Sequence, residues 1–217
     1  LSDEEIAQVV AYVMSLSPVT KDAADMPLTE AAKVGQEFSG ANGANWWLGY
    51  YREPRLIYTA QAFRKGEYLA SDRRTVHLAV DVFAPAGQSL HAPLAGEVQV
   101  VEDRANHLDY GGVVILKHHT DSGDAFYTLY GHLDPECCTR LSVGDKIAKG
   151  APFCQLGTAD QNGGWAPHVH FQLALSTEGI EADWPGVADP DDLALWIALC
   201  PNPAPLLNLP AAQVSYQ

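Results

Sequence analysis

Short hydrophobic runs alternate with polar, turn-forming clusters along most of this chain. From Trp46 onward the runs are rich in Val, Ile, Tyr and Phe, and clusters of Gly, Pro, Asn and Asp separate them. This alternation is typical of β-strands joined by turns. It predicts an all-β domain, whose best strand candidates are residues 76–83, 96–102, 111–118, 125–132, 152–157 and 168–175.

The pattern changes to helical features at two places outside these runs. Ser2 and Glu5 have the spacing of a capping box, apolar residues recur at helical intervals up to Leu16, and Pro18 ends the segment. Near the other end, Asp189-Pro190 precedes the segment DDLALWIALC, which predicts a capped helix with Pro at its first position. We therefore expect an N-terminal helix and a short C-terminal helix beside the β domain.

These elements divide a chain of 217 residues, which has room for one substantial domain or two small ones. Residues 19–44 mix Ala, Gly, Ser, Thr and acidic residues without periodicity, as linkers do. We expect the helix over residues 1–18, this linker, one domain over residues 45–200, and a Pro-rich C-terminal tail over residues 201–217, in which the segment from Pro201 to Pro210 is typical of an exit linker.

Composition narrows the functions that such a domain can have. The chain is 47% hydrophobic and 18% charged, so it can build a core. Its 27 acidic and 13 basic residues give a net charge of −14, which argues against nucleic acid as a partner. No apolar run approaches the roughly 18 to 20 residues that span a bilayer. No basic region followed by an apolar stretch marks a secretory signal, and this favours the cytoplasm over the cell envelope.

The four cysteines predict no disulfide framework and no cysteine-rich zinc site. Two of them are adjacent, and no C-x-x-C pair is present among Cys137, Cys138, Cys154 and Cys200. We expect reduced or structural thiols.

Candidate chemistry comes instead from histidines and one aspartate in the predicted strands. His77 and Asp81 lie four positions apart, which is about 13 Å on an ideal strand. They reach one metal ion only if the chain bends sharply between them or just after them. The segment Ala84-Pro85-Ala86-Gly87 follows at once and makes a bend plausible.

A second group of histidines lies further along the chain. His168 and His170 project to the same face of a strand with Cα atoms about 7 Å apart, which suits one metal ligand beside one proton-handling group. His132 ends an aromatic-rich strand. Three ligands of types His, Asp and His leave a tetrahedral zinc ion with one open position for water, and two further histidines would orient that water and move its proton.

The stretch from His77 to Leu173 resembles a zinc metallopeptidase domain of the lysostaphin/LytM type, peptidase family M23. The matching segments are HLAVDVFAPAGQSLHAPLAGEV, YTLYGHL, LSVGDKIAKGAPFCQLG and APHVHFQL, in the order of the family. The resemblance implies two antiparallel sheets that flank a groove with zinc at its floor, a fold related to the barrel-sandwich hybrid.

The resemblance also implies a role for each candidate residue. His77, Asp81 and His170 would bind one zinc ion (Zn2+) per chain, and His132 and His168 would be the catalytic histidines. The activity implied is that of a zinc-dependent endopeptidase or amidase. In the wider family the substrate is a cross-bridge or stem peptide of peptidoglycan, so a peptide or a peptidoglycan-derived molecule is the expected partner.

The flanking segments resemble a narrower group. WWLGYYREPRLIYT and DWPGVADPDDLALWIALCPNPAPLL are similar to the metallopeptidase module of larger bacterial chains. In those chains a kinase-like phosphotransferase precedes the module and a class III aminotransferase follows it. This context and the acidic charge argue against binding to the polyanionic cell wall.

Two alternatives stay open. APLAGEVQVV and VGDKIAKG also resemble the lipoyl or biotinyl carrier fold, although no Lys lies in the required setting and the histidines are left without a role. A non-catalytic scaffold that binds a partner through its groove is the other alternative. The remaining histidines, His91, His107, His118 and His119, are expected at strand-start, surface or edge positions without a metal.

Overall fold

The computed structural model describes residues 47–55, 74–177, 184–207, 209, 211 and 214–216. The helix predicted over residues 1–18 and the linker predicted over residues 19–44 lie outside them. Within this part of the chain, no helix is long and apolar enough to cross a membrane.

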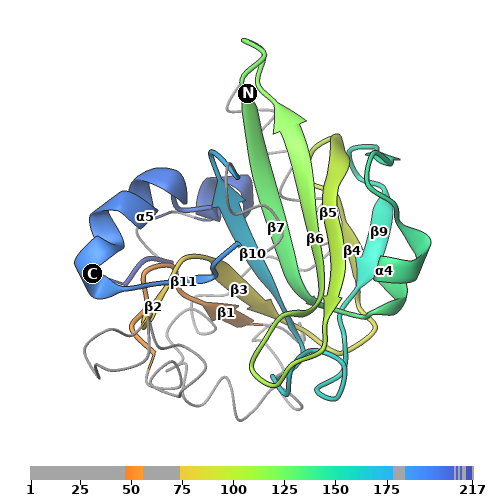
Figure 1. Cartoon of the computed structure of the whole chain (residues 1–217), viewed down its shortest axis with the longest axis horizontal. Coiled ribbons are helices and arrows are strands. Elements are labelled where there is room, and N and C mark those ends of the chain that lie inside the picture. Colours follow the sequence, from red (N-terminus) through yellow and green to blue (C-terminus); the bar gives the residue numbers. More distant parts are fainter. Residues whose placement is uncertain are drawn as a thin grey trace.

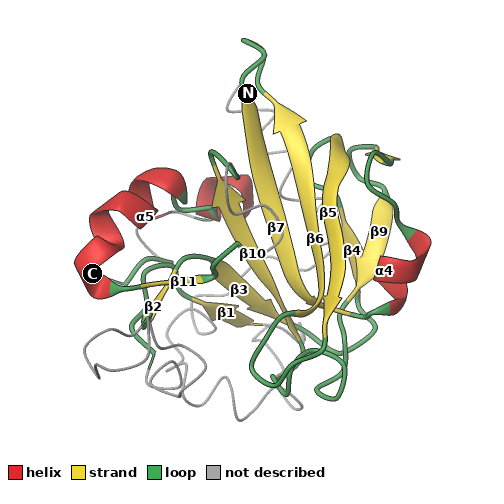
Figure 2. Ribbon diagram, viewed as in Figure 1, coloured by secondary structure: helices red, strands yellow, loops and turns green. Residues whose placement is uncertain are grey.

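A seven-stranded antiparallel sheet forms the centre of the fold (Figures 1 and 2). In spatial order its strands are β1 (Trp47–Gly49), β3 (Val80–Phe83), β10 (His168–Ala174), β7 (Ala125–Leu133), β6 (Gly111–His119), β5 (Gly96–Arg104) and β8 (Lys146–Ile147). Two antiparallel pairs complete the β structure: β2 (Val76–His77) with β11 (Val187–Ala188), and β4 (Ser89–His91) with β9 (Pro152–Gln155). The all-β prediction is confirmed, and a strand occurs in each predicted run.

Both faces of the sheet are covered. On β6, Val114 and Leu116 belong to one buried cluster, whereas Val113 and Ile115 belong to another. Because successive side chains of a strand point to opposite faces, the two clusters lie on opposite sides of the sheet. This explains why β6 is buried along nearly its whole length.

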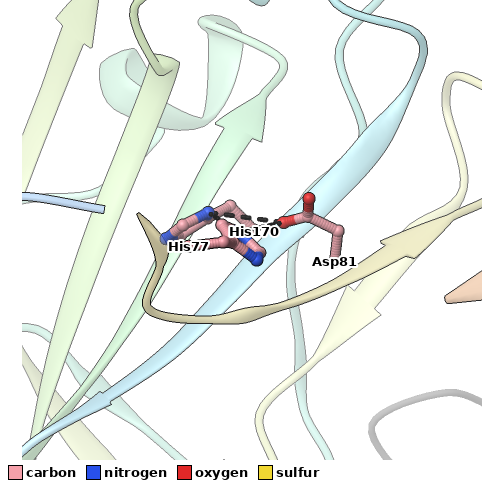
Figure 3. Close-up of side chains that lie close together, drawn as sticks. All are labelled: His77, Asp81 and His170. Atoms are coloured by element: carbon pink, nitrogen blue, oxygen red, sulfur yellow. Dashed lines mark hydrogen bonds and ion pairs between the residues drawn. The ribbon is translucent and has the colours of Figure 1, made fainter. Parts of the chain in front are cut away.

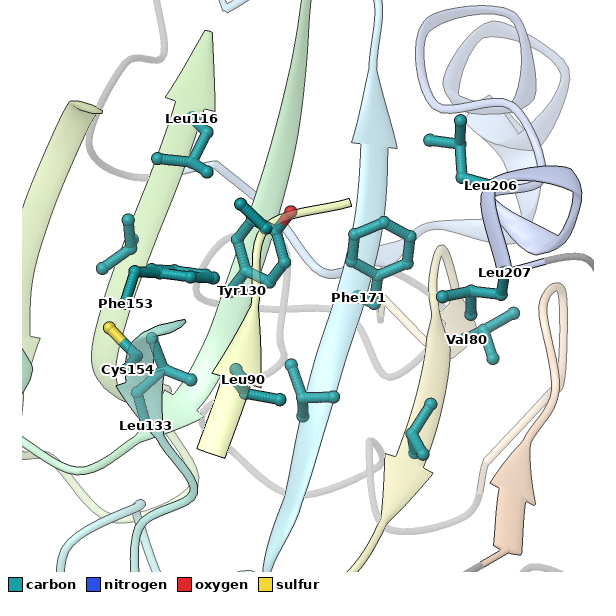
Figure 4. Packing of buried hydrophobic residues seen from close by; sticks show 14 of the residues in the cluster. Val80, Leu90, Leu116, Tyr130, Leu133, Phe153, Cys154, Phe171, Leu206 and Leu207 are labelled. Atoms are coloured by element: carbon teal, nitrogen blue, oxygen red, sulfur yellow. The ribbon is translucent and has the colours of Figure 1, made fainter. Parts of the chain in front are cut away.

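The larger cluster packs the β4–β9 pair and the C-terminal residues against one face. Tyr130 and Phe171 from the sheet meet Phe153 from β9 and Leu206 from the C-terminal region (Figure 4). Helix α4 (Glu136–Arg140) lies beside β9 at this side of the molecule (Figure 1). The smaller cluster packs Leu78, strand β11 and helix α5 (Leu193–Leu199) against the opposite face.

The C-terminal helix forms as predicted. The Asp189 carboxylate accepts a hydrogen bond from the Asp191 backbone N–H at 2.9 Å, and a short 3-10 helix (Pro190–Asp192) leads directly into α5. The Asp side chain accepts a hydrogen bond from one of the first unpaired backbone N–H groups of the helix, and Pro has no N–H that needs a partner. This is why the start of the helix could be predicted from the sequence.

The C-terminal tail differs from the expected exit linker. Residues Ala204–Leu207 form a 3-10 helix, and Leu206, Leu207 and Val214 are buried in the larger cluster. Tyr51 also forms a β-bridge with Ser215. The linker interpretation is wrong for the described part of the tail, because its leucines fill the space beside β3 and β10.

The position predicted for His118 from the sequence is also wrong. It was expected at a surface or edge, but it is buried in β6, where its Nδ1–H donates to the Ala95 carbonyl at 2.9 Å and its Nε2 lies 2.7 Å from Thr128 Oγ1. His118 is buried because side chains from other elements pack against both faces of β6. His107 and His119 are exposed, and all four cysteines are free thiols, three of them buried.

Candidate metal centre and active site

A sharp bend brings His77 to Asp81. Strand β2 ends at His77 and pairs with β11, whereas β3 begins at Val80 and joins the main sheet. The intervening bend is held by the Leu78 N–H, which donates to the Gly186 carbonyl at 3.0 Å. His77 Nε2 lies 3.1 Å from Asp81 Oδ1. The bend required by the sequence analysis therefore lies between the two residues and not after them.

The register between β3 and β10 brings a third residue, His170, to His77 and Asp81. His170 on β10 lies directly opposite Asp81 on β3, and the two side chains share a face of the sheet. His170 Nδ1 is 3.3 Å from Asp81 Oδ1 and 3.1 Å from His77 Nε2 (Figure 3). Tetrahedral zinc ligands at about 2.0–2.1 Å from the ion are separated by about 3.3 Å. This triangle therefore has the size of one face of a zinc coordination shell.

Hydrogen bonds fix which nitrogen of each imidazole faces the centre. His77 Nδ1 lies 2.9 Å from the Tyr50 carbonyl and 3.1 Å from Arg55 Nη2; in the tautomer whose Nδ1–H donates to the carbonyl, Nε2 carries the lone pair. His170 Nε2–H donates to Gln172 Oε1 at 2.8 Å, so its Nδ1 carries the lone pair. The Gln172 amide is itself oriented by its Nε2, which donates to the Pro185 carbonyl at 3.1 Å. Both lone pairs converge on the same point, as ligation of one ion requires.

The Asp81 carboxylate has one free and one occupied oxygen. Its Oδ2 accepts a hydrogen bond from Arg55 Nη1 at 2.7 Å, whereas the buried Oδ1 accepts none from the described residues. Burial opposes ionisation of Asp81, but His77 and Arg55 hold its pKa well below the usual value. Burial, followed by the Arg55 charge, lowers the pKa of His77 to about 4. At neutral pH the group is therefore an ionised carboxylate with a neutral imidazole, the protonation states that bind a cation.

His132 reaches the site through a bulge in β7. The β6–β7 register shifts so that Gly131 and His132 together face Val113. His132 adopts a φ of 63°, and its backbone N–H donates to the Tyr110 carbonyl at 2.8 Å. A left-handed φ is uncommon for a non-glycine residue and costs on the order of 1 kcal/mol. Bulges re-aim side chains, and this one turns His132 toward His170 and His168.

His132 and His168 form a close pair beside the three converging atoms. Their ring centroids are 4.2 Å apart, and His168 Nε2 lies 3.9 Å from Asp81 Oδ2. His132 Nδ1–H donates to the Asn162 carbonyl and His168 Nδ1–H to the Ala166 carbonyl, so each Nε2 carries a free lone pair. Burial lowers the pKa of both histidines. They are neutral at pH 7 and can accept a proton.

A cavity of about 320 Å³ adjoins this group, and His132 and His170 are among the residues that line it. Tyr110 lies between them, with ring centroids 5.6 Å from His132 and 5.3 Å from His170. A Cβ atom at Gly131 or at Gly186 would overlap the Tyr110 side chain. Glycine at both positions therefore lets Tyr110 pack directly against the site.

All five site residues predicted from the sequence meet at this place. Arg55, Gln172 and Tyr110 were not predicted from the sequence. Gln172 had a readable signal, because it continues the alternation of His168 and His170 on one face of β10. Arg55 and Tyr110 had none, since their contacts depend on tertiary packing between distant segments.

The sequence around this site matches a known protein family. Residues 75–182 match the model of peptidase family M23. No protein of curated function is a significant match to the chain.

Several solved structures are similar to the chain. A zinc containing peptidase from Vibrio cholerae is 21% identical, with 58% of this chain and 36% of that chain covered and a TM-score of 0.38. Lysostaphin in solution is 22% identical (69% and 50% covered, TM-score 0.40), and the catalytic domain of the prophage-encoded M23 protein EnpA from Enterococcus faecalis is 23% identical (66% and 85%, TM-score 0.40). The chain thus spans half or less of the length of the first two.

Proposed function

We propose that the chain is a zinc-dependent endopeptidase or amidase of peptidase family M23, on the basis of the match of residues 75–182 to the model of that family. The observation that supports this most directly is the convergence of three ligand atoms, from His77, Asp81 and His170, within 3.3 Å of one another. Peptides, including the cross-bridge and stem peptides of peptidoglycan, are the proposed substrate class.

His77 Nε2, Asp81 Oδ1 and His170 Nδ1 are the proposed zinc ligands. Two imidazole nitrogens and one carboxylate oxygen suit zinc, and three protein ligands leave a position for substrate or water. The buried Asp81 Oδ1, which accepts no hydrogen bond from the described residues, fits a ligand role. When bound, a zinc ion polarises the substrate carbonyl as a Lewis acid and lowers the pKa of water toward 7.

The His132–His168 pair would handle the proton of the reaction. Hydrolysis adds the oxygen of water to the carbonyl carbon, breaks the C–N bond, and moves one proton from water to the leaving amine. A free Nε2 lone pair on either histidine can accept that proton and return it. Because two imidazoles 4.2 Å apart disfavour two positive charges, the pair holds one proton at a time. Once protonated, the same Nε2–H can donate to the developing oxyanion.

Elemental analysis of the purified protein tests the metal site. We expect about one zinc per chain in the wild type, its loss in Asp81→Ala, and its retention in Asp121→Ala, which removes an exposed carboxylate. No zinc in the wild type, even after reconstitution, would leave a β scaffold with a groove, and the enzymatic proposal would then be withdrawn.

A variant of the proton-handling pair tests catalysis separately from metal binding. We expect His132→Ala to retain zinc and to lose about 100-fold or more in the rate of peptide hydrolysis, since positioned acid–base groups contribute on that order. The measurement is product formation from a panel of peptides, with zinc content determined on the same samples. Full activity in His132→Ala would show that this histidine has no catalytic role.

The acidic charge and the flanking segments support a setting away from the cell wall. We propose that the domain is a module of a larger bacterial chain, with weak affinity for peptidoglycan because both are anionic. Sedimentation with purified sacculi tests this, and strong co-sedimentation would overturn it.

A further inference from the structure

We propose that Arg55 is a positioning residue of the metal centre, whose guanidinium holds Asp81 so that one carboxylate oxygen, Oδ1, is left to bind the metal. The inference rests on the proposed function, since it concerns how a proposed zinc ligand meets the ion. Arg55 precedes residues 75–182, the part of the chain that matches the family model. The proposed role therefore belongs to a segment that this chain adds in front of the matched residues.

Backbone pairing fixes the segment that carries Arg55 beside β2. The Arg52 N–H donates to the His77 carbonyl at 2.8 Å, and the His77 N–H donates to the Glu53 carbonyl at 3.0 Å. The Arg55 N–H donates to the Thr75 carbonyl at 3.0 Å. The strand that carries the proposed ligand His77 thus also sets where the Arg55 side chain begins.

The guanidinium of Arg55 contacts three groups around the centre. Its Nη1 donates to Asp81 Oδ2 at 2.7 Å, and its Nη2 lies 3.1 Å from His77 Nδ1. Its Nε donates to Glu53 Oε2 at 3.2 Å. The side chains of Arg55 and Asp81 are only 11% and 1% exposed, so water screens this ion pair far less than a surface pair. A charge-assisted hydrogen bond of this kind is strong and fixes the direction of the carboxylate.

The two oxygens of Asp81 consequently have different environments. Oδ1 lies 3.1 Å from His77 Nε2 and 3.3 Å from His170 Nδ1, and it accepts no hydrogen bond from the described residues (Figure 3). A carboxylate can bind a metal ion through one oxygen or through both. Binding through both would cost Oδ2 its hydrogen bond to Arg55. Binding through Oδ1 alone keeps three protein ligands and the open position that hydrolysis requires.

Glu53 offsets the charge that Arg55 brings to the centre. A guanidinium beside a cation would on its own weaken the binding of that cation by repulsion. The Glu53 carboxylate, whose side chain is 12% exposed, pairs with Arg55 on the side of the guanidinium away from Asp81 Oδ2. The Glu53–Arg55 pair therefore supplies hydrogen bonds to Asp81 with little net charge.

Cobalt substitution tests how Asp81 binds. Co2+ accepts the same nitrogen and oxygen ligands as zinc, and its visible absorption weakens as ligands are added to a four-coordinate centre. We expect Arg55→Met to lose absorption relative to the wild type, because Asp81 can then bind through both oxygens. Arg55→Lys should restore part of it, since an ammonium group can donate to Oδ2. Arg52→Gln, which removes an exposed arginine of the same segment, should keep the wild-type spectrum.

Two further variants keep the test decisive if Arg55→Met does not fold. Arg55→Gln retains a neutral donor and should absorb less than Arg55→Lys, because a neutral amide competes poorly with a cation for Oδ2. Glu53→Gln keeps Arg55 but leaves its charge without a partner. We expect this variant to keep the wild-type cobalt spectrum and to bind zinc about tenfold more weakly, as measured by competition with a chelator.

Metal binding, cobalt spectra and peptide hydrolysis, measured on the same samples, separate this inference from the proposed function. A wild-type spectrum in Arg55→Met, or in Arg55→Gln where Arg55→Met does not fold, would overturn the role of Arg55 and leave the peptidase proposal intact. The expected spectral changes in a protein that cleaves no peptide would support the role of Arg55 and contradict the peptidase. A wild type that binds neither metal would overturn both.

Discussion

Each histidine of the centre is held by the nitrogen that faces away from it. Backbone carbonyls hold His77, His132 and His168, and the Gln172 side chain holds His170. Such outer hydrogen bonds select the tautomer and the ring orientation before any ion binds. His170 is the exception among the four, because its partner is a side chain that mutation can remove.

Gln172→Leu should therefore weaken zinc binding by about 10- to 100-fold, the usual effect of losing an outer-shell partner. The substitution leaves His170 Nε2–H without an acceptor and frees the ring to adopt the other tautomer. Competition with a chelator of known affinity measures the change. Gln172→Glu keeps an oxygen in the same place and serves as the matched control. Equal losses in both variants would show that packing, and not the acceptor, matters at this position.

At the scale of secondary-structure elements, two interruptions of regular strand pairing bring the residues of the site together. The bend at Leu78-Ala79 separates β2 from β3, and the bulge at Gly131-His132 interrupts β7. Regular strands would leave His77 about 13 Å from Asp81. The register between β3 and β10 then places Asp81 opposite His170. The positions at which the strands are interrupted therefore determine the metal centre as much as the residues in the strands do.

The strands and the need for a bend could be predicted because both follow from local sequence. Alternating hydrophobic runs mark strands, and the spacing of His77 and Asp81 requires a bend if both bind one ion. The bulge at His132 could not be predicted, since it depends on how β6 and β7 pair. The burial of His118 and of the tail was missed for a similar reason, because it depends on what covers each face of the sheet.

The buried tail makes a prediction about stability. Leu206 lies in the larger cluster with 7% of its surface exposed, so Leu206→Ala should lower the free energy of unfolding by about 3 kcal/mol. Leu195→Ala on α5, where the leucine is 60% exposed, should change it by less than about 0.5 kcal/mol. Urea unfolding followed by tryptophan fluorescence measures both. Similar midpoints for the two variants would contradict the docking of the tail.

At the scale of the whole molecule, the fold buries several histidines in their neutral form. Burial lowers the pKa of His132 and His168 at the site and of His118 in the sheet, and it lowers that of His77 to about 4. Their ordinary pKa in an unfolded chain is about 6.5. Between these values the unfolded chain binds protons that the folded chain does not. The free energy of unfolding of the metal-free protein should therefore fall as the pH drops below about 6.5.

His118 allows this effect to be isolated away from the metal centre. It stacks on Phe126 at 5.1 Å, and the charge of neighbouring His119 adds to the effect of burial in disfavouring its protonation. A histidine that is neutral when folded and protonated when unfolded contributes a slope of at most about 1.4 kcal/mol per pH unit. We expect His118→Gln to be less stable than the wild type at pH 7.5, because it disturbs the contacts to Ala95 and Thr128.

The difference between the two proteins should then shrink as the pH falls to 5.5, because the variant has lost one proton-uptake site from its unfolded state. Urea unfolding at a series of pH values measures this convergence. Leu206→Ala is the matched control, since it lowers stability without changing any titratable group, so its curve should run parallel to that of the wild type. A His118→Gln curve that is also parallel would mean that His118 gains its proton in the folded protein as readily as in the unfolded chain. Convergence would show instead that the covered face of β6 makes the whole fold sensitive to acid.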